Sequence, residues 1–406
     1  MPKPAHPCHS SSNTRQRSAP CIAFYAPLKS PRHPVPSGDR KIAQLFSQAL
    51  SNAGFEVELA SQLRSFDKTG NAVRQQRLTA LATREVERIL RRWARHNIKP
   101  SAWFSYHLYY KAADLIGPQI CRRLNIPYVV AEASWAEKRA TSAWSTYHAL
   151  VSDALQLAAK VICINPVDRS ALCHYYRHRI VSPIVSMQAF IDTVVEQTHP
   201  CSTISATHAP SRASIATQYG LNPAKPWLLC IAMMRAGDKH LSFKQLSTVI
   251  SQLKHPHQLL IIGDGAMRQQ VIQLFAAQKT VHFAGSMDNL QIKHLLPAFE
   301  ILLWPAVNEA LGMVFLEAQQ AGLAVVSADH GGVSSVVAHQ HSGYVCAAND
   351  TSAMANKVDQ LLSDPQLLTT MQGHAKRYID DNHSLTTASL QLRQLLIDVM
   401  PPKTAI

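Results

Sequence analysis

The chain has 406 residues, roughly two to three times the commonest domain size, so a single small module is excluded and two domains are expected. Its composition is 47% hydrophobic and 16% charged, which excludes an intrinsically disordered chain. Lys and Arg outnumber Asp and Glu by 40 to 26, and the formal charge of +14 favours partners that carry phosphate or other anionic groups.

The first 20 residues are rich in Pro, Ser and basic side chains, a composition typical of a flexible tail. They lack the apolar segment of a signal peptide, and no apolar run in the chain reaches the roughly 18 to 20 residues that a membrane span needs. The eight cysteines are scattered without a C-x-x-C pair, which indicates buried free thiols and no zinc site. We therefore expect a cytoplasmic protein.

Residues 21–193 are predicted to form a first α/β domain. The apolar stretch 21–26 and the alternating stretch 55–59 are predicted as strands, with an amphipathic helix over 37–53 between them. Helical stretches alternate with three further predicted strands, at 102–106, 128–131 and 161–164.

A long amphipathic helix is predicted over residues 72–97 of this domain. Two interpretations of its basic face stay open: a solvated helix surface, or a peripheral contact with anionic lipid on the inner face of the membrane. Nucleic acid is not an expected partner, because no aromatic stacking platform or known DNA-binding motif accompanies the charge. Seven arginines dominate the polar face: Arg74, Arg77, Arg84, Arg88, Arg91, Arg92 and Arg95.

A linker is predicted at residues 194–215, where Pro, Ser, Thr and His displace apolar residues, and a second βα series at 216–380. Short Val, Ile and Leu runs alternate there with helix-length segments, which predicts a parallel, doubly wound sheet. A final helix within 381–406 could cross back to the first domain. Two such domains imply a cleft, with ligands at the carboxyl ends of the strands. The predicted strands are 227–233, 258–262, 281–284, 301–304, 324–328 and 344–346.

The sharpest motif is the segment 305–322, which follows a predicted strand and opens a helix. Gly312 and Met313 are expected at the helix start, where free N–H groups and the helix dipole favour an anionic ligand. Glu309 precedes this start and Glu317 lies one turn inside the helix. Since carboxylates are poor phosphate ligands, their natural partners are the hydroxyls of a sugar and of a ribose.

Basic and glycine residues follow two other strands of the second domain. Arg235 and Lys239 come after its first strand and could bind a diphosphate. Gly263-Asp264-Gly265 ends another strand, where a ligand could approach the backbone closely. All these groups are expected at the same edge of the sheet.

This ordered set of motifs resembles the family 4 glycosyltransferases of the GT-B fold, over about residues 227–365. Glu309 and Glu317 match the E-x7-E motif of that family, and Arg235 and Lys239 match the basic pair that binds its donor diphosphate. The glycines at 263, 265, 331, 332 and 343 match further family positions. The resemblance implies two Rossmann-like domains facing a cleft, a nucleotide-diphosphate sugar as donor substrate, retention of anomeric configuration, no cofactor and no essential metal.

The first domain resembles the family more loosely. Gly38, within Ser37–Arg40, occupies the place of the glycine-rich loop after the first strand, and His107 falls where many members carry a histidine near the reacting sugar. Asp39 and Arg40 can form a local salt bridge and are left out of the predicted site. The chain departs from the family at 131–134, in place of a T-H-G-like element, and around Ser334 and Ser335, in place of a glutamate.

The resemblance implies transfer of a hexose from a nucleotide-diphosphate sugar to a glycan, lipid-linked or small-molecule acceptor. A GT-B epimerase or phosphorylase stays an alternative, although non-hydrolysing epimerases lack E-x7-E, and so does a catalytically inactive partner subunit. The expected catalytic residues are His107 and Glu309, and the expected donor-binding residues are Gly38, Arg235, Lys239, Gly265, Gly312, Met313 and Glu317.

Overall fold

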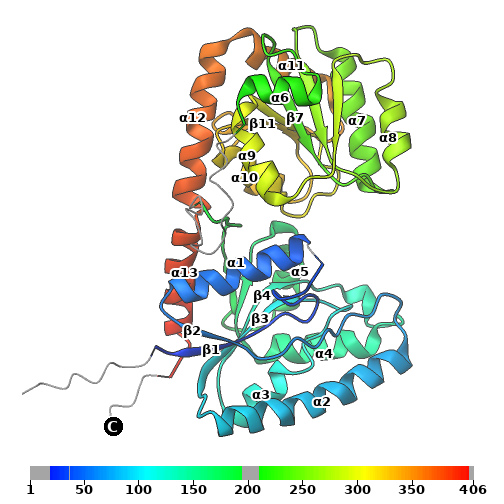
Figure 1. The fold of residues 1–406 in the computed structure, drawn as a ribbon. Helices are drawn as coiled ribbons and strands as arrows, with labels where there is room; N and C mark the ends of the chain where they lie inside the picture. The colour runs from blue at the N-terminus through cyan, green and yellow to red at the C-terminus, as the bar shows by residue number, and fades with distance from the viewer. Residues whose placement is uncertain (1–18, 36, 194–209, 402–406) are drawn as a thin grey trace, which may run out of the picture.

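The computed structural model describes residues 19–35, 37–193 and 210–401. Most of the predicted tail, 1–20, and most of the predicted linker, 194–215, lie outside these residues. The described part forms two α/β domains joined along one side by helices near the C-terminus (Figure 1). Within the described ranges, no helix is long and apolar enough to cross a membrane.

The first domain is built on a parallel sheet of six strands in the order β2-β1-β3-β4-β5-β6. The strands are β1 (Cys21–Tyr25), β2 (Glu56–Leu59), β3 (Pro100–Leu108), β4 (Tyr128–Ala133), β5 (Ala158–Cys163) and β6 (Ile184–Ser186). The helices are α1 (Gly38–Asn52), α2 (Ala72–Arg95), α3 (Gly117–Leu124), α4 (Ser145–Leu157) and α5 (Pro166–Tyr175).

Helices cover both faces of this sheet because alternate residues of its strands are apolar on both sides. In β1, Ile22 and Phe24 pack into one cluster with Phe46 of α1, whereas Ala23 and Tyr25 pack into a second cluster with Trp93 of α2. All of these side chains are buried. The carboxyl edge of the sheet is left for loops, and these loops face the second domain (Figure 1).

The second domain repeats this architecture with the strand order β12-β11-β10-β7-β8-β9, all parallel. Its strands are β7 (Trp227–Ile231), β8 (Gln258–Ile262), β9 (Val281–Gly285), β10 (Ile301–Trp304), β11 (Ala324–Ala328) and β12 (Gly343–Cys346). Its helices are α6 (Arg212–Tyr219), α7 (Asp238–Gln252), α8 (Arg268–Leu274), α9 (Asn289–Leu295), α10 (Met313–Gln320), α11 (Thr351–Ser363) and α12 (Pro365–Asn382).

The last helix, α13 (Leu385–Ile397), leaves the second domain and packs against α1 of the first (Figure 1). At the crossing, Ile191 N–H donates to His383 O (2.9 Å) and Leu385 N–H donates to Ile191 O (2.9 Å). The fully buried Leu392 and Leu396 anchor α13, each contributing roughly 2 kcal/mol of apolar burial. The hydrophobic cluster around α1 and α13 continues into the second domain, so the two sheets share a buried seam.

The predicted two-domain α/β fold is confirmed, with differences in detail. The short strand β6 was not predicted, and α6 begins at Arg212, inside the predicted linker. The predicted strand 227–233 ends at Ile231, and the predicted helix 72–97 ends at Arg95. The expectation of buried thiols is wrong for Cys173, which is exposed on α5, while Cys8 and Cys201 lie outside the described residues.

Candidate active site between the two domains

The loop from β10 to α10 carries Glu309 and ends at Gly312, the N-cap of α10. Gly312 has φ 58°, and a Cβ there would lie 2.4 Å from the ring of Phe315, so both the backbone conformation and the space require glycine. No side chain caps α10. The first N–H groups of the helix, beginning with Met313, therefore remain available to an anionic ligand.

A turn after β11 fixes the backbone of Glu309. Gly332 N–H donates to Glu309 O (3.0 Å), and a Cβ on Gly331, which has φ 59°, would lie 2.0 Å from that oxygen. Loop residues on the other side bind α7: Val307 N–H donates to Ser242 Oγ (3.0 Å) and Asn308 Nδ2 donates to Asp238 Oδ1 (3.1 Å). Glu309 is thus held between two elements of the second domain.

The structure brings the predicted Lys239 and Glu309 together as an ion pair, with both side chains about four-fifths buried. Lys239 Nζ also lies 5.4 Å from the ring centroid of Trp304, at the end of β10. Arg235 is exposed on the loop before α7, and within the described ranges its side chain has no carboxylate partner. Gly265 lies beside that loop, because Met234 N–H donates to Asp264 O (2.9 Å).

Lys41, in the first turn of α1 in the first domain, forms an ion pair with Glu317 of α10 in the second. Gly38 is the first residue of α1, and Ser37 caps the helix by accepting the N–H of Arg40 (3.2 Å). Lys41 was not predicted as a site residue. A cation in the first turn opposes the helix dipole, and this was the one local signal that could have identified it.

His107 lies in β3 with φ 63°, and its Nδ1 donates to Asp39 Oδ1 (3.0 Å). This hydrogen bond lowers the pKa of the Asp39 carboxyl. The suggestion that Asp39 pairs with Arg40 is wrong, because Arg40 Nη1 instead donates to Pro34 O (3.2 Å). Asp39 therefore belongs to the site as the residue that orients His107.

Glu132, at the position of the T-H-G-like element, is a further residue that sequence reasoning missed. It sits at the end of β4 next to His107, since Tyr106 of β3 pairs with Ala131 of β4. It has φ 58°, and its Oε1 accepts the N–H of Ile164 (3.0 Å). Burial raises the pKa of Glu132 to about 7. In the sequence, the only indication that Glu132 belongs to the site is the departure from the family pattern at this position.

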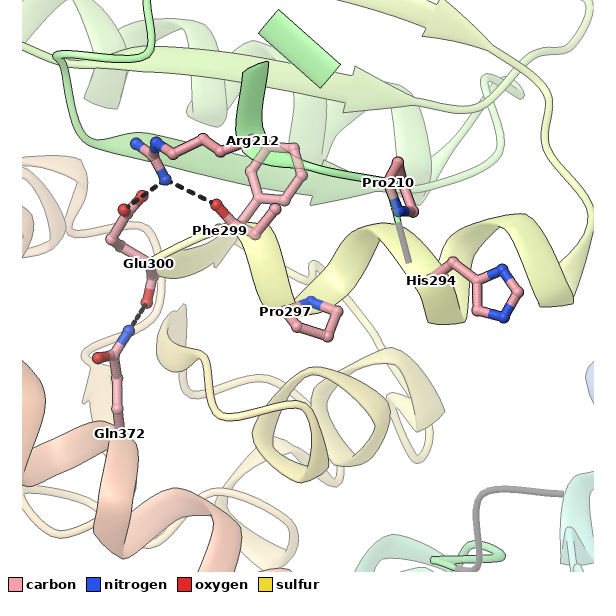
Figure 2. Close-up of a pocket in the computed structure, with 8 residues that line it drawn as sticks. Pro210, Arg212, His294, Pro297, Phe299, Glu300 and Gln372 are labelled. Atoms are coloured by element: carbon pink, nitrogen blue, oxygen red, sulfur yellow. Dashed lines mark hydrogen bonds and ion pairs between the residues drawn. The ribbon is translucent and has the colours of Figure 1, made fainter. Parts of the chain in front are cut away.

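A hollow of about 460 Å³ in the second domain contains none of the predicted site residues (Figure 2). It lies beside a structural cluster in which Arg212 Nη1 donates to Ala298 O and Glu300 Oε1 (both 2.9 Å). Gln372 of α12 donates to Glu300 O (3.0 Å) (Figure 2). These bonds tie α6 and α12 to β10, so we assign this hollow no part in the site.

A second hollow, of about 440 Å³, lies between the domains near the chain crossing. Asn165 and Arg169 of the first domain line it together with Ser335 and with Gln391 of α13. Ser335 is one of the two serines, with Ser334, around which the family's glutamate is replaced. Among the described side chains, no group of three or more His, Cys, Asp or Glu is arranged to hold a metal ion.

Comparison with known proteins finds a matching family model, a curated relative and solved structures with a similar fold. Residues 220–378 match the family model of the glycosyl transferases group 1. The chain is 24% identical to N-acetyl-alpha-D-glucosaminyl L-malate synthase of Bacillus anthracis over 55% of its own length and 56% of that protein. It thus spans about half the length of this curated relative.

Two solved structures match almost the whole chain. They are HepE of Anabaena in complex with UDP (TM-score 0.66, 15% identity, 93% of this chain and 100% of that one) and sucrose-phosphate synthase from Thermosynechococcus elongatus (TM-score 0.64, 16% identity, 93% and 98%). At this identity the likeness concerns the fold, and it confirms the predicted GT-B architecture.

Proposed function

Since residues 220–378 match the family model of the glycosyl transferases group 1, we propose that this chain transfers a hexose from a nucleotide-diphosphate sugar to an acceptor held by its first domain. The observation that carries the proposal is the Lys239–Glu309 ion pair beside the uncapped start of α10. A cation, a carboxylate and free backbone N–H groups meet there, which suits a ligand that carries both a diphosphate and sugar hydroxyls.

Both carboxylates of the motif form ion pairs with lysines, Glu309 with Lys239 and Glu317 with Lys41. A bound diphosphate would attract these lysines and Arg235 more strongly than one carboxylate does, because it carries more charge. Glu309 is then free to accept a hydroxyl of the transferred sugar, and Glu317 a ribose hydroxyl. The negative charge of the donor diphosphate therefore draws the lysines away from Glu309 and Glu317 and frees both carboxylates to bind hydroxyls.

The proposed reaction retains the anomeric configuration and uses neither a cofactor nor a metal ion. The acceptor oxygen bonds to the anomeric carbon, the bond from that carbon to the diphosphate breaks, and the acceptor proton passes to the departing phosphate oxygen. Lys239, Arg235 and the start of α10 stabilise the charge that develops on the leaving group. The sequence has no Asp-x-Asp motif, so these groups replace the metal in that role.

Donor binding and turnover test the proposal directly. UDP, GDP and ADP are compared by thermal shift, followed by a nucleotide-sugar panel assayed for slow donor hydrolysis, which needs no acceptor. One nucleotide should raise the melting temperature through preferential binding to the folded state. Lys239→Ala and Glu309→Ala should each reduce hydrolysis at least a hundredfold, whereas Lys244→Ala, exposed on the same helix, should leave it unchanged.

The same assays separate the alternatives. Normal turnover in both site variants would reject the assignment of Lys239 and Glu309. Formation of an epimerised nucleotide sugar, seen by NMR, would favour an epimerase. Nucleotide binding without turnover of any donor would favour an inactive partner subunit.

We also propose a cytoplasmic location with peripheral membrane contact through α2. Arg77, Arg84 and Arg95 are exposed on this helix and, within the described ranges, have no carboxylate partner. The apolar Val73 and Leu81 are exposed among them, a combination that suits an interfacial helix on anionic lipid. The paired arginines of α2, Arg88 and Arg92, bind Glu85 and Glu58 instead.

Liposome co-sedimentation tests this contact. Vesicles containing phosphatidylglycerol should pull down the protein, and neutral phosphatidylcholine vesicles should not. Replacing Arg77 and Arg84 with Gln should reduce the binding constant about thirtyfold, since each basic residue near the surface contributes about 1 kcal/mol. Replacing the exposed Lys244 and Lys376 of the second domain with Gln removes the same charge and should have little effect. Binding that ignores lipid charge would refute the proposal.

A further inference from the structure

A run of aromatic rings starts at His107 and extends along the cleft-facing loops of the first domain. The ring centroids of His107 and Tyr109 are 4.9 Å apart, those of Tyr109 and Tyr110 5.6 Å, and those of Tyr110 and Trp144 5.4 Å. Tyr109 and Tyr110 follow β3, and Trp144 lies on the loop that follows β4. The rings therefore lie at the carboxyl edge of the sheet, where ligands of such sheets bind.

Two cationic side chains lie over the rings of Tyr110 and Trp144, at the end of this run away from His107. The guanidinium carbon of Arg139 lies 4.7 Å from the ring centroid of Tyr110 and 5.1 Å from that of Trp144. Lys111 Nζ lies 5.7 and 5.6 Å from the same two centroids. Both charges thus share one aromatic platform, which attracts cations through the ring faces.

Neither cation has a counter-charge in the described part of the chain. Among the described residues, no carboxylate lies within ion-pair distance of Arg139 or Lys111, and Arg139 Nε is buried without a hydrogen-bond partner. The nearby Asp67 carboxylate instead accepts the N–H of Asn71 (2.8 Å) and Nε2 of Gln75 (2.9 Å). Some other arginines of this domain do have a carboxylate partner, as Arg122 does in Asp153 (2.6 Å).

The platform is held by bonds that do not involve its charges. Asp67 N–H donates to Lys111 O (2.8 Å), Trp144 Nε1 donates to Asp67 O (3.5 Å), and Ser142 Oγ donates to Arg139 O (2.9 Å). The side chains of the platform are half-buried, so each keeps an accessible part. The buried Arg139 Nε is costly to leave without an acceptor, and a ligand that binds the accessible part of the guanidinium can supply one.

We propose that Tyr109, Tyr110, Trp144, Lys111 and Arg139, here called the acceptor platform, bind a sugar that carries a phosphate or carboxylate group. The apolar face of the sugar ring stacks on the aromatic side chains, and the anion binds Arg139 and Lys111. The inference rests on the proposed transfer function, because it names the acceptor of that reaction. His107 adjoins the acceptor platform through its ring contact with Tyr109.

Binding of small probes to the whole chain tests the platform without any donor. Glucose 6-phosphate, glucuronic acid, glucose and inorganic phosphate are titrated by tryptophan fluorescence and by saturation-transfer NMR. Glucose 6-phosphate or glucuronic acid should bind at least tenfold more tightly than glucose or phosphate, and the stronger of the two identifies the anion. Equal binding of glucose, or of phosphate, would overturn the proposal.

Variants locate the binding. Arg139→Gln should weaken the anionic sugar at least tenfold, Arg139→Lys should restore part of the loss, and Lys138→Gln, the exposed neighbour, should change nothing. UDP affinity should stay unchanged in all three, which also shows that they fold. Unchanged sugar binding in Arg139→Gln would overturn the proposal that the acceptor platform binds the anionic sugar. If the wild type binds no nucleotide, the proposed transfer function is wrong, but the measured sugar binding still holds.

Discussion

The carboxyl group of Glu132 occupies an uncommon position for a titrating side chain. It is largely buried at the end of β4, its residue has a left-handed backbone conformation, and one of its oxygens accepts the N–H of Ile164 (3.0 Å). Burial raises its pKa to about 7, although the neighbouring His107 acts in the opposite direction. Glu132 can therefore change charge near neutral pH beside the histidine of the candidate site.

Replacing Glu132 with Gln should change how stability depends on pH. The carboxyl of the unfolded chain titrates near 4.5 and that of the folded protein near 7, so the folded state holds the extra proton between these values. Wild-type stability should thus fall as pH rises from about 4.5 to 7, relative to the variant, by up to about 3 kcal/mol. Urea unfolding at pH 5 and pH 7.5 measures this difference.

The exposed Glu56→Gln serves as the control and should keep the wild-type pH profile. In Glu132→Gln the new amide keeps an oxygen that can accept the Ile164 N–H, so a uniform loss of stability is not expected. Parallel profiles for wild type and Glu132→Gln would show that this carboxyl does not titrate in the window.

Residues of the candidate site could be predicted where the signal is local in the sequence. Glu309 and Glu317 stand out because a fixed spacing links a loop to the helix that follows it. Lys41 could not be placed, because its partner Glu317 is 276 residues away. The same holds for the contact of His107 with Asp39, 68 residues away, and that is why Arg40, the adjacent cation, was a plausible but wrong partner.

At the scale of elements, the position of Glu309 depends on the turn after β11. Gly331 has φ 59°, and any Cβ there would meet the carbonyl oxygen of Glu309 at 2.0 Å. That oxygen also accepts the N–H of Gly332 (3.0 Å). A larger residue in the turn must therefore push the Glu309 loop towards the cleft or break this bond.

Gly331→Ala should lower stability by roughly 1 to 3 kcal/mol and donor turnover at least tenfold, because the strained turn displaces Glu309. Chemical unfolding and donor hydrolysis are measured together. Gly373→Ala is the matched control: this glycine lies inside α12 with open space around its Cβ position, so alanine should stabilise the protein by about 0.5 to 1 kcal/mol. Full activity in Gly331→Ala would mean that the turn does not position Glu309.

The sequence predicted the buried parallel strands correctly but missed elements that are short or polar, such as β6 and α6. Strands such as β8 are short apolar runs buried on both faces, so their sequence is distinctive. The three residues of β6 are half-buried or exposed and give no such run. The helix α6 was hidden in a polar stretch, although Ser211 caps its start and Gly220 ends it in a left-handed conformation.

At the scale of the whole molecule, two features couple the domains. The helix α13 packs on α1 and carries a continuous hydrophobic cluster across the chain crossing. Near the start of α1, Lys41 binds Glu317 of α10 across the cleft. The first feature is an extended buried contact, whereas the second is a single half-buried ion pair that a charged ligand can replace. Such a pair contributes about 1 kcal/mol or less, enough to bias a domain equilibrium severalfold.

Reversing the charge of Lys41 should move the two domains apart, because Lys41→Glu replaces its ion pair with Glu317 by two facing carboxylates. Small-angle X-ray scattering should show a larger radius of gyration than in wild type, with the difference shrinking at high salt as the repulsion is screened. Lys41→Met, which only removes the attraction, should give an intermediate value. Lys99→Glu makes the same charge change on an exposed side chain just before β3 and should leave the scattering unchanged. If Lys41→Glu scatters like wild type at every salt concentration, the ion pair does not control the separation of the domains, and the contacts of α13 with α1 alone set it.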